Sequence, residues 1–206
     1  MTVDGSRALR LTVGTAGAGL LLGGTALWLG LAESAIALWG FGAAGLLQVP
    51  PALSLRGRIR EGLGNRGLER ERLTLRTVSH LLRLLALGMA LVSGAALMGD
   101  RAPQASLSAL TVAVLAIVFL GPLWYAKQGL AGIHATLELD AARSRTLLEL
   151  AALLLAGGLL GRWFPWADAT TGMVMALRLF LEGRTLAKST TLQAASCGSC
   201  GSCGCG

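Results

Sequence analysis

All four cysteines of the chain lie within its last ten residues, at Cys197, Cys200, Cys203 and Cys205, and only Gly and Ser separate them. A thiolate is a soft ligand for Zn, Cd and Cu(I), and four thiolates can close a tetrahedral zinc or cadmium site. The spacing is tight and no apolar residues surround it, so an adaptable site or a Cu(I) site fits as well. We expect residues 189–206 to form a disordered, Cys-rich, metal-binding tail. The alternative is a low-complexity extension that binds nothing.

The rest of the chain has the composition of a membrane protein. Of 206 residues, 53% are hydrophobic and 14% are charged, whereas soluble domains carry about 25% charged residues. A charge at the centre of a bilayer costs about 3 kcal/mol on insertion scales, so membrane segments avoid charges. The net charge of +7 comes from basic residues beside apolar segments. This pattern favours a role in membrane orientation, and we expect no nucleic-acid partner.

Six apolar segments approach the length of about 20 residues that a bilayer span needs. They cover residues 11–31, 35–55, 78–98, 105–126, 137–161 and 168–187. The loop at 56–77 carries seven arginines, and both ends of the chain are basic. Because basic loops stay in the cytoplasm, we predict an all-α, multi-pass protein of the inner cell membrane. Residues 1–188 would form a domain of six transmembrane helices with both termini cytoplasmic.

Ionisable residues inside apolar segments are costly, so each is a candidate for function. Asp140 and Ser144 are four residues apart and share one helix face. They can offer two oxygen ligands to a divalent ion, or Asp140 can pair with a nearby arginine. Asp168 starts the last segment and either interacts with its helix dipole or lies on an ion path. Arg178 and Glu182 are expected to neutralise each other, with an inner gate or ion path at Glu182 as the alternative.

Gln48 lies inside the second segment, just before Pro50 and Pro51. The two prolines should kink this helix, and Gln48 is expected to hydrogen-bond a carbonyl that the kink leaves free. The chain contains no Ser-His-Asp set, no zinc-protease motif and no phosphate-binding loop. We therefore do not expect an enzyme.

The arrangement of these features resembles the transmembrane domain of the cation diffusion facilitator (cation efflux) family, in its short branch without a cytoplasmic C-terminal domain. The resemblance covers about residues 8–190. The segments that carry it are Ser-Ala-Ile-Ala-Leu-Trp-Gly-Phe-Gly at 34–42, Asp-Ala-Ala-Arg-Ser at 140–144, Trp-Ala-Asp at 166–168 and Glu-Gly at 182–183.

This resemblance implies efflux of Zn, Cd, Co or Fe ions, usually in exchange for protons, by a homodimer. It places the transport ligands at Asp140 and Ser144 on one helix and at Ala44 and Gln48 on another. The family has acidic or His ligands where this chain has Ala44 and Gln48, and a carboxylate where it has Ser144. The site would therefore carry one formal negative charge, which is little for a divalent ion in a low-dielectric environment.

Two functions follow from these observations. The first is a membrane transporter that expels a divalent or soft heavy-metal cation by proton antiport and whose tail captures cytosolic metal. The second is a membrane-anchored metal-binding or partner protein with a degenerate transport site. In both, the metal (Zn, Cd, Co, Fe or Cu) is transported or held by the tail, and no cofactor is tightly bound.

Overall fold

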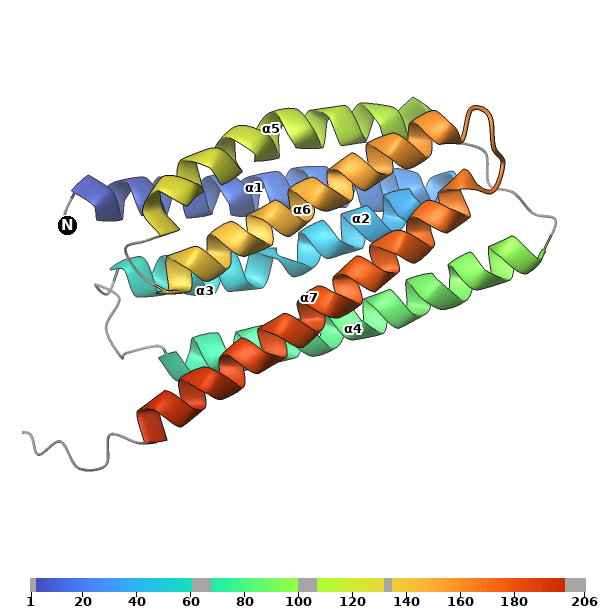
Figure 1. The fold of residues 1–206 in the computed structure, drawn as a ribbon. Coiled ribbons are helices and arrows are strands. Elements are labelled where there is room, and N and C mark those ends of the chain that lie inside the picture. Colours follow the sequence, from blue (N-terminus) through green and yellow to red (C-terminus); the bar gives the residue numbers. More distant parts are fainter. Residues whose placement is uncertain (1–2, 61–67, 100–106, 132–134, 199–206) are drawn as a thin grey trace, which may run out of the picture.

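The computed structural model describes residues 3–60, 68–99, 107–131 and 135–198. Every regular element within these residues is an α-helix, which confirms the predicted all-α class. The helices are α1 (Val3–Ala32), α2 (Ile36–Leu47), α3 (Val49–Arg60), α4 (Leu68–Met98), α5 (Leu107–Ala131), α6 (Ala135–Leu160) and α7 (Ala167–Gly198). They run side by side in an elongated bundle, in which α3 continues the line of α2 (Figure 1).

Four stretches of the described helices are long and apolar enough to cross a membrane. They are Ala8–Ala32 in α1, Ile36–Gly57 across α2 and α3, Glu69–Met98 in α4, and Leu107–Gly129 in α5. These stretches indicate a membrane protein. They overlap the first four predicted segments, and the third begins at Glu69, nine residues before its predicted start. Helices α6 and α7 have comparable lengths, but charged residues lie along their middle as well as at their ends.

The helices associate mainly in pairs. Helix α7 packs along α4, α6 along α5, and α1 along α2, and α2 also contacts α4, α6 and α7 (Figure 1). The core between the pairs is made of large apolar side chains that are fully buried. They include Leu38, Phe41, Leu82, Met89, Leu147, Leu150, Leu154, Met175 and Leu179. Helix α2 is therefore the central element, and residues on it can meet several neighbours.

Close contact between α1 and α2 depends on glycine. A Cβ atom at Gly42 would overlap the backbone of Leu27, and one at Gly30 would overlap the backbone of Trp39. Small residues let membrane helices approach in this way and gain dispersion contacts between backbones. The connection between the two helices is a short turn in which Ser34 has a φ of 56°, in the left-handed region.

The predicted kink of the second segment is confirmed as a break at Gln48. Pro50 and Pro51 lie in the first turn of α3, where a missing N–H is tolerated. Neither proline can donate a hydrogen bond to a carbonyl of α2, so α2 ends at Leu47 and α3 begins at Val49. This break leaves the Gln48 side chain beside α6.

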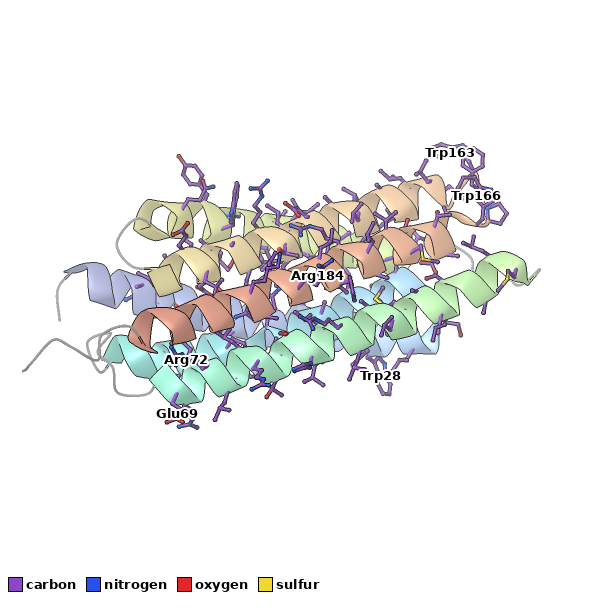
Figure 2. The ribbon with its side chains drawn as sticks, turned by 60° about the horizontal axis from the view of Figure 1, so that its bottom comes forward. Trp28, Glu69, Arg72, Trp163, Trp166 and Arg184 are labelled. Carbon is purple, nitrogen blue, oxygen red and sulfur yellow. The ribbon has the colours of Figure 1, made fainter. Side chains whose placement is uncertain are left out.

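The two ends of the bundle differ in chemistry. Trp163 and Trp166 lie together in the connection between α6 and α7 at one end, whereas Glu69 and Arg72 lie at the other end, near the start of α4 (Figure 2). Both tryptophans are exposed. Aromatic residues are typical of the membrane–water interface, so this end is suited to lie at a bilayer surface.

Candidate functional site: a polar cluster between α2, α5 and α6

The predicted site residues Asp140 and Ser144 face α5, where they meet Lys127. The Lys127 Nζ atom lies 2.5 Å from Asp140 Oδ2, and it donates a hydrogen bond of 3.0 Å to Ser144 Oγ. Ser144 Oγ in turn donates to the backbone carbonyl of Asp140, at 3.0 Å. The side chains of Lys127 and Asp140 are only 5% and 10% exposed. The two oxygen atoms that were expected to bind a cation therefore already bind the ammonium group of the protein itself.

A short connection brings these residues together. Helices α5 and α6 are antiparallel neighbours, with α5 ending at Ala131 and α6 beginning at Ala135. Lys127 lies one turn before the end of α5, and Asp140 lies in the second turn of α6. Residues at these positions face each other across an antiparallel helix pair. The short connection between two antiparallel helices therefore explains the ion pair, because α5 extends past residue 126 and includes Lys127.

Gln48 approaches the same part of α6 from α2. Its Nε2 atom donates a 3.4 Å hydrogen bond to the backbone carbonyl of Arg143, the residue before Ser144. The expected acceptor was a carbonyl freed by the kink in its own helix, so the partner differs although the type of bond is the same. Ala44 lies one turn earlier on α2 and is fully buried, but its methyl group offers no ligand.

Little space remains around the ion pair. A cavity of about 10 Å³ lies beside Lys127 and Asp140, and Thr12 of α1 and Leu137 of α6 contribute to its lining. A cavity of this size has room for at most about one water molecule. A metal ion with several ligands would need a larger cavity or the departure of the Lys127 side chain.

A second group of buried charges lies between α6 and α7. Arg143 is 6% exposed and Glu182 is 4% exposed, and their opposite charges attract each other. Both carboxylate oxygens of Glu182, and Nε and Nη2 of Arg143, lack a hydrogen-bond partner among the described residues. Burial of such groups is costly unless they are hydrogen-bonded, so the site is suited to hold water.

Arg178 does not pair with Glu182 as expected. Its guanidinium group contacts Glu149 of α6, with Nη2 2.5 Å and Nε 2.7 Å from Oε2. Glu149 also accepts a 2.9 Å hydrogen bond from Arg145, one turn earlier on α6. The four-residue spacing of Arg178 and Glu182 on one helix would allow an ion pair. The guanidinium group of Arg178 instead binds Glu149 on the neighbouring helix.

Asp168 lies at the other end of the bundle and has a structural partner. Its Oδ2 atom accepts a 2.8 Å hydrogen bond from the backbone N–H of Ile36, and Oδ1 accepts a 3.2 Å bond from the N–H of Ala37. The carboxylate is in the first turn of α7, as expected, but it caps the N-terminus of α2. Unpaired N–H groups and the positive end of the helix dipole both favour a carboxylate there.

The cysteine tail lies largely outside the described residues. The backbone of α7 continues to Gly198, eleven residues past the expected end of the last segment, and so includes the backbone of Cys197. The side chain of Cys197 and residues 199–206, with Cys200, Cys203 and Cys205, are not among the described parts. Metal binding by the tail therefore stays a prediction. Among the residues that are described, no group of three or more His, Cys, Asp or Glu side chains could hold a metal ion.

The chain was also compared with known proteins. Neither protein-family models nor curated proteins match it.

Proposed function

We propose that this chain is a membrane-anchored metal-binding protein, built on a bundle that resembles a cation diffusion facilitator but does not transport. Its six helical rods would cross the inner cell membrane with both termini in the cytoplasm, and its cysteine tail would bind a soft cation such as Zn, Cd or Cu(I). The four clustered cysteines support the metal-binding part of the proposal. The position of Lys127, whose ammonium group binds Asp140 and Ser144, supports the absence of transport.

Charge balance is the physical reason for a non-transporting bundle. Asp140 and Lys127 together are neutral, and neither Ser144 nor Gln48 adds a negative charge. A divalent cation that left water for this buried position would lose its hydration and gain no net electrostatic attraction. The ion pair, by contrast, is satisfied within the bundle and joins α5 to α6.

The orientation in the membrane is proposed from the distribution of charged and aromatic residues. One end of the bundle is rich in basic residues, with seven arginines at 56–77 and further basic residues near both termini. Basic residues favour a cytoplasmic location for that end. The exposed Trp163 and Trp166 at the opposite end suit the outer interface. In this orientation the tail lies in a reducing compartment, where its thiols stay free to bind metal.

Metal efflux by proton antiport is the second candidate function. It is favoured by the convergence of Asp140, Ser144 and Gln48, which come from the two helices that the family resemblance implies. For transport, the Lys127 side chain would have to leave Asp140 when the metal enters. Its proton could then be the one exchanged for the cation.

One experiment separates the two functions. Purified protein would be reconstituted in proteoliposomes, and influx of Zn, Cd, Co and Fe(II) would be measured under a proton gradient. The same protein, and a variant with all four cysteines changed to Ser, would be titrated with Zn to count bound ions. Asp140→Asn serves as the control that removes the buried carboxylate and keeps the tail.

A membrane-anchored metal binder should show no flux with any of these ions, and it should bind zinc only while the cysteines are present. Metal flux in the wild type that Asp140→Asn abolishes would overturn this proposal in favour of a transporter. Equal zinc binding by the wild type and the Cys→Ser variant would refute the role of the tail.

A further inference from the structure

An apolar groove lies between α4 and α7, which pack along each other (Figure 1). Its volume of about 410 Å³ is within the range of about 300–1,000 Å³ that small-molecule sites have. All of its lining residues are apolar, and they include the short side chains of Ala86, Ala90 and Ala176 beside the larger Leu87, Leu177 and Phe180. Because the alanines are short, space remains between the two helices. An apolar space of this kind takes hydrocarbon in preference to water.

The groove lies at the depth of lipid acyl chains in the proposed topology. Helix α7 begins at Ala167, beside the tryptophans of the outer interface. The lining residues Met173 and Phe180 follow Ala167 by six and thirteen residues, or by about 9 Å and 20 Å at 1.5 Å per residue. A hydrocarbon layer is about 30 Å thick. The groove therefore extends through the middle of the layer into its cytoplasmic half.

Two arginines lie at the cytoplasmic end of the groove. On α7, Arg184 follows Phe180 by one turn on the same helix face, and it is exposed (Figure 2). On α4, Arg83 precedes Leu87 by one turn. Arg184 lies seventeen residues after Ala167, or about 26 Å along the helix. An arginine side chain at this depth is long enough to reach the headgroup region of the bilayer.

A close contact between the helices places Arg83 beside Arg184. The Nη2 atom of Arg83 donates a 3.2 Å hydrogen bond to the backbone carbonyl of Gly183, the residue before Arg184. A Cβ atom at Gly183 would lie 2.9 Å from Cγ of Arg83, so the glycine lets the arginine lie against α7. Guanidinium groups bind phosphate oxygens strongly, often through two parallel hydrogen bonds. Two arginines at one place are therefore suited to a phosphate group.

The opposite end of the groove has no such charges. Residues 91–98 of α4 and 167–172 of α7 contain no Lys, Arg or His. A lipid of the outer leaflet would therefore meet no basic side chain beside the groove. The cytoplasmic leaflet is the one that carries a negative surface potential from anionic lipids, and it lies at the end where the arginines are.

We propose that an anionic phospholipid of the cytoplasmic leaflet binds between α4 and α7, with one acyl chain in the groove and its phosphate group at Arg83 and Arg184. The apolar lining holds the chain, and the guanidinium groups select a negatively charged headgroup. The bound chain fills the space that the alanines leave between the two helices. The proposal rests on the proposed membrane topology and is independent of metal binding.

Native mass spectrometry of the full-length protein tests this site. The protein would be reconstituted in nanodiscs of equal parts phosphatidylglycerol, which is anionic, and phosphatidylcholine, which is neutral. It would then be released, and the lipids that stay bound would be counted. Arg184→Gln removes one guanidinium group from the proposed site. Its matched control is Arg145→Gln, which removes an exposed arginine from α6 while Glu149 keeps its contact with Arg178.

A second pair of variants tests the groove itself. Ala90→Leu places a larger apolar side chain in the groove and leaves both arginines intact. Ala152→Leu makes the same change at an exposed position of α6 and serves as its control. A lipid held only by surface charge would be insensitive to both changes, and this result would overturn the proposed acyl-chain site.

The wild type should retain phosphatidylglycerol in preference to phosphatidylcholine. Arg184→Gln should lower the retained phosphatidylglycerol about fivefold, the effect of one basic residue near an anionic lipid surface. Ala90→Leu should lower the retention of both lipids, and the two controls should behave as the wild type. Equal retention of the two lipids by the wild type, or equal losses in Arg184→Gln and Arg145→Gln, would overturn the proposal. Dimers that carry no lipid would overturn it as well, because a second copy would then cover the groove.

The topology has a readout of its own. A membrane-impermeant maleimide should label the native tail cysteines in inside-out vesicles, whose cytoplasmic side is accessible, and not in right-side-out vesicles. The reverse pattern would refute the topology and, with it, the leaflet assigned to the lipid. The expected pattern, together with unchanged lipid retention in Arg184→Gln and Ala90→Leu, would refute the lipid site alone.

Discussion

The carboxylate of Asp168 caps the helix that begins at Ile36, a residue 132 positions earlier in the chain. Because Asp168 belongs to α7 and Ile36 to α2, the contact joins the last helix to the central one. It also satisfies two of the N–H groups that every helix start leaves without a partner. At the end of the bundle that carries Trp163 and Trp166, hydrogen bonds thus hold α7 to α2.

Replacement of Asp168 by Ala should therefore destabilise the bundle. Loss of a capping carboxylate typically costs about 1–2 kcal/mol, and two N–H groups would lose their acceptor. Asp168→Asn keeps one acceptor oxygen and should lose less. Thermal unfolding in detergent measures the effect, and hydrogen exchange at Ile36 and Ala37 should accelerate in the Ala variant. Unchanged exchange at these two amides would contradict the capping role.

The Lys127–Asp140 pair should behave as a coupled unit. Lys127→Met or Asp140→Leu alone leaves a buried charge without its partner, which typically costs about 3–5 kcal/mol. The double variant removes both charges and should be more stable than either single variant. Unfolding midpoints of the four proteins form a double-mutant cycle that measures the coupling. Additive losses in the double variant would show that the two side chains do not depend on each other.

Glycines on α1 and α2 should respond differently to the same substitution. Gly42→Ala places a methyl group against the backbone of Leu27, so the two helices must separate and the bundle should lose stability. Gly24→Ala meets nothing within 4 Å and should be neutral or stabilise by up to about 1 kcal/mol, because Ala favours the helix. Thermal unfolding of the two variants provides the comparison. Equal effects at both positions would argue against the tight α1–α2 contact.

Removal of metal should leave the bundle intact. The proposed ligands are in the tail, whereas Asp140 and Ser144 of the bundle are bound to Lys127. A chelator should release bound zinc and leave the unfolding midpoint within about 1 °C, unlike structural zinc sites, whose loss unfolds the domain. The Cys→Ser variant, which lacks these ligands, is the control. A large fall in the midpoint on chelation would place the metal inside the bundle.

The length of the apolar segments and the positions of the prolines allowed much of the fold to be predicted. All six apolar segments correspond to helical rods, and Pro50 and Pro51 interrupt the second at the expected place. The shared face of Asp140 and Ser144 was also correctly inferred, because it depends only on spacing within one helix. Local features of this kind need no knowledge of which helices are neighbours.

Contacts between helices were harder to predict. Lys127 lies just beyond residue 126, the predicted end of the fourth segment, so the predicted segments do not place it on a helix that faces Asp140. Arg178 has carboxylates within reach on its own helix and on α6, and only the rotation of α7 against α6 selects Glu149. Asp168 was assigned to its own helix because the sequence does not show that α2 begins beside it.

The ammonium group of Lys127 has a consequence for how the protein is made. A bundle that needed a bound metal to neutralise Asp140 could mature only when that metal was supplied. This bundle carries its own positive charge on α5, the helix synthesised immediately before Asp140. The neutralisation of Asp140 therefore needs no metal, and we expect newly made protein in metal-starved cells to insert as efficiently as in replete ones.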